Sequence, residues 1–161
     1  MAISDFHAST IIKVRVYFGF DQFECDPSEI SIALGIKPDE VRRKGEKRKL
    51  RNGKEMKMEN RANSWGIESK SDSKDINDHL RELLVKLKGK EKLIEERFGK
   101  PSFSVLWEGN YLYAGSGPFY ERDVLKGIVA FGADLWQDIY QIDQSDDEIE
   151  NKSEFKRIPK W

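Results

Sequence analysis

The stretch IIKVRVYFGF, residues 11–20, decides the fold. Apolar side chains occupy every even position from Ile12 to Phe20, and residues such as Lys13 and Arg15 stand between them. A β-strand points successive side chains to opposite faces, so a period of two puts all of these apolar groups on one face. The stretch therefore predicts a strand with one face turned to the core.

A short helix is expected directly after this strand. Asp26 is suited to cap free backbone amides, Pro27 to the first helical position, and Glu29 to complete a capping box. Gly35 is a suitable left-handed end, with Pro38 just beyond it. The local chemistry thus predicts both ends of the helix.

The remaining chain alternates between strand and helix patterns. Asn52-Gly53, between extended arms, is a strong hairpin signal. The expected elements are a polar hairpin or loop at 48–58, a strand at 64–69, an amphipathic helix at 75–88, a second helical piece ending before Gly99, a strand at 103–107 continuing at 111–113, a helix at 120–131 and a strand at 135–142.

This order predicts an α+β two-layer sandwich, with a mixed or antiparallel sheet and helices on one face. A Gly follows a short helix both at Gly35 and at Gly132, which hints at two related strand–helix–strand halves. We expect one domain over residues 1–143, with a basic hairpin or loop at 42–61. Residues 144–161 form a polar C-terminal tail that we expect to be partly ordered.

The composition excludes several classes of protein. A single Cys among 161 residues excludes a disulfide framework and multi-thiolate metal sites. No apolar run approaches the roughly 18–20 residues that cross a bilayer, so no membrane partner is expected. Residues 1–10 lack the basic start and apolar block of a signal peptide. We therefore expect a cytoplasmic protein.

The net charge of −1 conceals two charged blocks. Residues 42–61 contain ten Lys or Arg and three Glu, and residues 134–150 contain seven acids and no base. Such blocks pair within a fold or with a partner. The candidate contacts on the basic side are Arg42, Arg43, Lys44, Lys47, Arg48 and Lys49, and those on the acidic side are Asp146, Asp147 and Glu148.

The sequence gives little support to catalysis. Cys25 precedes a helix start, where amides lower a thiol pKa, but it is better explained as a turn residue. His7 and His79 are both interpreted as surface residues, so neither a catalytic triad nor a histidine metal site is expected. The loop at 115–120 lacks the third glycine of a dinucleotide loop and is interpreted as a strand-to-helix turn. No cofactor or metal is predicted.

Two other classes of function remain open. One is a small-ligand or enzymatic pocket, lined by Trp65, Trp107, Trp136, Asp138 and Tyr140. Asp134 and Asp138 share parity and are suited to acid–base work, although we favour a pairing of Asp138 with the basic block. The other class is nucleic-acid binding, which we rank below protein binding because residues 42–61 contain no aromatic side chain to stack on bases.

Several ordered motifs resemble the bacterial domain-of-unknown-function family 4279. They are Phe18-Gly-Phe-Asp, Asp26-Pro-Ser-Glu-Ile-Ser-Ile-Ala-Leu-Gly-Ile-Lys-Pro38, Arg43-Lys-Gly-Glu46, Ser64-Trp-Gly-Ile-Glu-Ser69, His79-Leu-Arg-Glu-Leu-Leu84 and Leu135-Trp-Gln-Asp-Ile-Tyr140. The resemblance covers about residues 10–143 and implies a small α+β domain. We associate such domains with toxin–immunity and other conflict loci, which implies a binding protein more than an enzyme.

The resemblance also separates shared from individual parts. Gly35, Trp65, Asp138 and Tyr140 belong to the shared motifs and are expected to determine the fold. The charged block between Gly45 and Trp65 and the tail after Asp143 depart from the family pattern. We therefore predict a non-catalytic, immunity-like interaction protein that engages a protein partner through charge complementarity.

Overall fold

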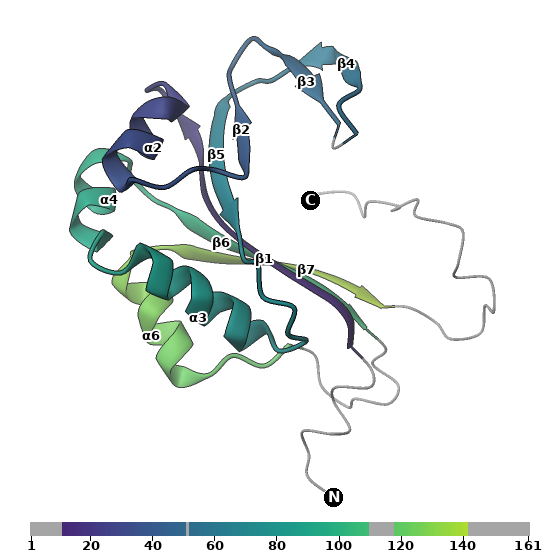
Figure 1. Ribbon diagram of the computed structural model, residues 1–161, viewed down its shortest axis with the longest axis vertical. Helices are drawn as coiled ribbons and strands as arrows, with labels where there is room; N and C mark the ends of the chain where they lie inside the picture. The colour runs from purple at the N-terminus through teal and green to yellow at the C-terminus, as the bar shows by residue number, and fades with distance from the viewer. Residues whose placement is uncertain (1–10, 51, 110–117, 142–161) are drawn as a thin grey trace, which may run out of the picture.

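A five-stranded sheet forms the centre of the molecule. The computed structural model describes residues 11–50, 52–109 and 118–141 (Figure 1). The strands are β1 (Ile11–Phe23), β2 (Glu40–Arg42), β5 (Asn63–Glu68), β6 (Ser102–Gly109) and β7 (Asp134–Gln141), in the spatial order β2-β5-β1-β6-β7. All neighbours are antiparallel except β6 and β7, which are parallel. The sheet is therefore mixed, as predicted.

Helices cover one face of this sheet (Figure 1). The described residues form four of them: α2 (Pro27–Leu34), α3 (Ile76–Leu87), α4 (Glu91–Arg97) and α6 (Arg122–Ala130). Three even positions of β1 lie beneath them: Val16 and Phe18 are fully buried and Phe20 is 2% exposed. The period of two therefore identified the core-facing side of β1, and the predicted α+β class is confirmed.

Phe18 is at the centre of an aromatic cluster. Its ring centroid lies 5.4 Å from that of Phe20, 5.0 Å from Phe103 and 6.1 Å from Phe131. Each tilted or edge-on pair at such a distance stabilises the fold by about 0.5–1.5 kcal/mol, in addition to the effect of burying the two rings. Three separate elements, β1, β6 and the end of α6, are joined through this one side chain.

The local chemistry sets the ends of α2 as predicted. Asp26 accepts a hydrogen bond from the Ser28 amide at 2.8 Å, and Glu29 accepts one from the Asp26 amide at 3.2 Å. Gly35 ends the helix with a φ of +63°. β1 differs from prediction, because it continues three residues beyond Phe20 through a bulge at Gln22, whose φ is +61°.

Helices α3 and α6 pack closely because Gly127 has no side chain. A Cβ at Gly127 would lie 2.6 Å from a terminal carbon of Leu84. Arg81 of α3 holds the start of α6 as well, with its Nε 3.1 Å from an oxygen of Asp123 and a second ion pair to Glu121. These contacts fix which side of α6 faces solvent.

The two strand–helix–strand units differ in their pairing. β7 follows α6 and lies directly beside β6, whereas β2 follows α2 and is separated from β1 by β5. Both α2 and α6 are followed by a glycine, but the strands on either side of the two helices are arranged differently. The structure therefore does not show two equivalent strand–helix–strand halves. The expected strand at 111–113, the glycine loop at 115–117 and the tail at 144–161 lie outside the described residues.

Candidate functional site

The basic block forms an arm that extends from one end of the sheet (Figure 1). We define the arm as residues 43–61. Within it, β3 (Lys47–Lys49) and β4 (Glu55–Glu59) pair as a separate two-stranded antiparallel sheet. At the turn, Gly53 has a φ of +81° and its amide donates to the Leu50 carbonyl at 2.8 Å. The asparagine–glycine signal correctly located this hairpin.

Asparagine side chains hold the base of the arm. The amide group of Asn63 donates to the carbonyls of Phe23 at 3.1 Å and Cys25 at 3.0 Å, and its oxygen accepts from the Lys44 amide at 2.9 Å. Asn60 donates to the Arg43 carbonyl at 3.1 Å. The arm is thus tied to the end of β1 by hydrogen bonds.

Part of the positive charge is neutralised locally. Arg42 pairs with Glu40 in β2, and Arg43 Nε lies 3.3 Å from a carboxylate oxygen of Asp26. Lys47 and Lys49 both pair with Glu55, at 3.9 and 3.7 Å. These ion pairs are exposed, and such pairs contribute about 0–1 kcal/mol each. They shape the charge pattern more than they stabilise the arm.

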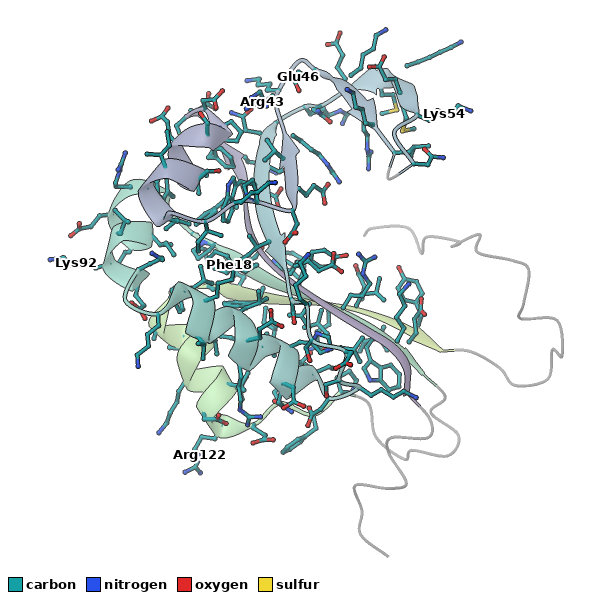
Figure 2. All side chains as sticks on the ribbon, viewed as in Figure 1. Phe18, Arg43, Glu46, Lys54, Lys92 and Arg122 are labelled. Atoms are coloured by element: carbon teal, nitrogen blue, oxygen red, sulfur yellow. The ribbon has the colours of Figure 1, made fainter. Side chains whose placement is uncertain are left out.

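The other described cations of the arm make no ion pair with any described residue. They are Lys44, Arg48, Lys54, Lys57 and Arg61. Figure 2 shows Lys54 near the tip of the arm and Arg43 near its base. Of the basic residues proposed from sequence, Lys44 and Arg48 thus carry unpaired charge, while the other four have acidic neighbours. The acidic residues Asp146, Asp147 and Glu148 lie outside the described residues.

Two apolar side chains accompany these charges. Leu50 is 45% exposed and Met58 is 52% exposed, while Met56 is half-buried. Exposed apolar groups beside cations give a surface both long-range attraction and short-range contact. The arm therefore combines the two components that a protein-docking surface uses.

The residues of the alternative pocket are divided between the two faces of the sheet. Trp65 and Trp107 are buried beneath the helices, and Trp65 Nε1 donates to Ser31 Oγ at 2.9 Å. Trp136, Asp138 and Tyr140 lie on the face opposite α2, α3, α4 and α6, because their neighbours in β7, Leu135 and Ile139, pack against the core. Trp136 is 66% exposed. The structure does not bring the five residues together.

The aspartates of β7 also lack a shared site. Asp134 and Asp138 do have the same parity, as expected. Asp134 pairs with Lys100 at 2.7 Å, whereas Asp138 makes no ion pair with any described residue of the basic block. Among the described residues of the block the predicted pairing of Asp138 is wrong, because β7 is at the opposite edge of the sheet from β2, where the block begins.

His79 corrects another expectation, since it is buried rather than on the surface. It is 2% exposed, and its Nε2 lies 2.7 Å from the Ser73 carbonyl oxygen. Nδ1 lies 3.0 Å from Ser69 Oγ, which donates to Glu82 at 2.6 Å. Although burial opposes it, the hydrogen bonds from Ser69 and from the Lys70 and Ser71 amides lower the pKa of Glu82. This network fastens the segment after β5 to α3.

Burial shifts the pKa of two further titratable groups upward. Burial raises the pKa of the Cys25 thiol, so the lowering considered from its place before α2 does not occur. Burial also raises the pKa of Tyr120 to about 12, and its enclosed hydroxyl has no hydrogen-bond partner among the described residues. Both groups are neutral under physiological conditions.

The described ranges contain no cluster of three or more His, Cys, Asp or Glu side chains placed to hold a metal ion. Among those same residues, no helix has the length and apolar character needed to span a membrane.

The fold defines a class of α+β proteins in which helices cover one face of a mixed five-stranded sheet that carries a projecting hairpin. A family model described as "Domain of unknown function (DUF4279)" matches residues 12–142, and the chain belongs to that family. The resemblance seen in the sequence motifs is thereby confirmed. No curated protein and no solved structure matches the chain.

Proposed function

We propose that this protein is a non-catalytic interaction protein whose arm docks on an acidic surface of a partner protein. The observation that carries the proposal is a set of five arm cations that pair with no described residue, on a hairpin that extends from the sheet: Lys44, Arg48, Lys54, Lys57 and Arg61. Arg48 is half-buried and the other four are exposed. Surface cations of this kind speed the encounter with an acidic partner and select against basic ones.

The apolar residues of the arm support a contact that lasts beyond the encounter. Leu50 and Met58 present flexible apolar side chains among the cations. Interface energy is concentrated in a few buried anchors, and burial of one such side chain contributes about 1.5–3 kcal/mol. An acidic partner with an apolar recess would satisfy both components of the arm.

The charge pattern favours a protein over a nucleic acid as partner. Glu46, Glu55 and Glu59 are interleaved with the cations and weaken the attraction of the arm for a continuous phosphate backbone. The arm also lacks aromatic side chains on which bases stack. A protein surface with mixed charges fits this pattern better. Protection against a toxin, the immunity-like role implied by the family resemblance, is one setting for such a contact.

The test compares two charge variants of the full chain. The arm variant carries Gln at the five unpaired positions, Lys44, Arg48, Lys54, Lys57 and Arg61. The matched control carries Gln at five exposed lysines elsewhere, Lys37, Lys74, Lys86, Lys88 and Lys92. Each protein is used to capture partners from a nuclease-treated lysate of the source cells, and the partner is quantified by mass spectrometry.

We expect wild type and control to recover the same acidic protein, and the arm variant to recover at least about tenfold less of it, a difference of about 1.4 kcal/mol. Equal recovery by the arm variant would refute the proposal. Binding of labelled single-stranded or duplex DNA or RNA that the arm variant loses, without capture of a protein, would instead support the nucleic-acid alternative.

A further inference from the structure

A second surface lies on the outer side of α6, away from the arm (Figure 1). Val124 and Ile128 of this helix are buried, and Gly127 faces α3. The remaining side of the helix borders an open groove of about 540 Å³. Its lining residues are Phe119, Tyr120, Arg122, Leu125, Lys126 and Val129.

The groove exposes apolar surface. Phe119 is 73% exposed, Leu125 41% and Val129 74%. Leu125 and Val129 are four residues apart, so they are neighbours on the same helical face. Single exposed apolar residues are normal on a protein surface, but a group of them around one groove is typical of a binding site.

The acidic and basic side chains at the start of α6 lie on different sides of the helix. Glu121 and Asp123 flank the groove in sequence, but both carboxylates are bound by Arg81 on the α3 side. Arg122 and Lys126 line the groove itself and make no ion pair with a described residue. Figure 2 shows Arg122 pointing away from the body of the molecule. The groove is therefore lined by apolar side chains and by two cations that pair with no described residue.

We infer that this groove docks an acidic amphipathic helix of a partner protein. Apolar side chains one turn apart on such a helix would cover Leu125 and Val129, and carboxylates beside them would meet Arg122 and Lys126. A second copy of this chain fits less well. A two-fold contact of groove on groove would bring Arg122 and Lys126 against the same cations of the other copy.

The probe for this inference is a labelled synthetic peptide of about five helical turns, with Leu along one face and Glu on both flanks. Two peptides serve as controls: one has the same composition with the Leu residues dispersed around the helix, and one has Lys in place of Glu. Binding is followed by fluorescence anisotropy, and the site is mapped by amide chemical-shift changes in the full chain.

Two groove variants and two matched controls separate the groove from the general surface. The groove variants are Val129→Asp and the double variant Arg122→Glu, Lys126→Glu. The controls are Val85→Asp, since Val85 is also 74% exposed but lies on α3, and Lys92→Glu on α4, whose side chain is 86% exposed. All five substituted positions are exposed on helix surfaces, so the four variants are expected to fold.

We expect saturable binding of the amphipathic acidic peptide, with shifts at residues 119–129. Each groove variant should weaken it at least about tenfold, and the controls should leave it unchanged. Absence of saturable binding, equal binding of either control peptide, or shifts confined to the arm would overturn the inference. So would tighter binding to vesicles containing anionic lipid, or a concentration-dependent dimer that Val129→Asp abolishes. Because the arm is unchanged in these variants, the result is independent of the proposed function.

Discussion

The arm and the sheet–helix body are stabilised by different forces. The body buries a continuous apolar cluster in which Phe18, Trp65 and Leu80 are almost completely enclosed. The arm contributes no buried apolar side chain to that cluster and is ordered by backbone pairing and by the asparagine contacts at its base. The side chains that stabilise the fold by burial and the charged side chains of the arm therefore lie in separate parts of the chain. Surface charge can therefore be altered in the arm at little cost to the core.

The largest change in the free energy of unfolding is expected from a substitution in the body. Phe18→Ala removes a fully buried ring and its contacts with three other rings, which should reduce the free energy of unfolding by about 3–5 kcal/mol. Met58→Ala in the arm is the matched truncation of an exposed side chain and should change it by less than about 0.5 kcal/mol. Urea denaturation of both variants measures the difference. Similar losses for the two would show that the regions are not energetically separate.

An intermediate loss of stability is expected from a substitution at the base of the arm, where the arm joins the body. Asn63→Ala removes three hydrogen bonds, two of them to the carbonyls of Phe23 and Cys25 at the end of β1 and just after it, at a cost of about 1–3 kcal/mol. Amide exchange in the arm should accelerate more than in β1. Asn52→Ala at the tip removes one exposed contact, to the Lys54 amide, and is the control. Unchanged exchange in the arm of Asn63→Ala would show that the base does not hold it.

The smallest effect concerns the link between α2 and the arm. Hydrogen bonds from Ser28 and from Arg43 lower the pKa of Asp26 from 3.8 to about 2. Because the pKa is lower in the folded state, the contact stabilises the folded state above pH 4, and the stabilisation is lost as the pH falls from about 4 to 2. The Ser28 amide signal should therefore titrate with a midpoint near 2.

Asp26→Asn serves as the control for this titration, because asparagine still caps a helix but carries no charge. Its Ser28 signal should not shift between pH 4 and 2. A wild-type midpoint near 4 would show that neither the cap nor Arg43 holds the carboxylate.

Features that depend on neighbouring residues in the sequence were predictable. Features that depend on contacts between distant residues were not. The period of two identified β1, and cap chemistry identified both ends of α2, because each depends on neighbours in sequence. The three-residue β2 carries too few residues for any period. The burial of His79 depends on Ser69 and Ser73, whose segment returns to α3 in a way that no helical pattern records.

The candidate sites were predictable to different degrees. The arm was visible in the sequence because charge density and the turn at Asn52-Gly53 are both local features. Which of its cations are unpaired depends on partners such as Glu55 and Asp26, and only the fold shows them. The groove on α6 was missed, because Leu125 and Val129 appear as ordinary apolar residues until the covered side of the helix is known.

The position of β1 has a consequence for biosynthesis. This strand leaves the ribosome first among the described elements, yet it occupies the middle of the sheet, and its two neighbours β5 and β6 begin only at residues 63 and 102. Its two edges must therefore remain unpaired until β5 and then β6 have been translated. The hairpin of the arm, whose pairs are close in sequence, has no such delay. A nascent chain stalled before β5 would display an unpaired, aromatic-rich strand, the kind of segment that chaperones bind and that aggregates when they are absent.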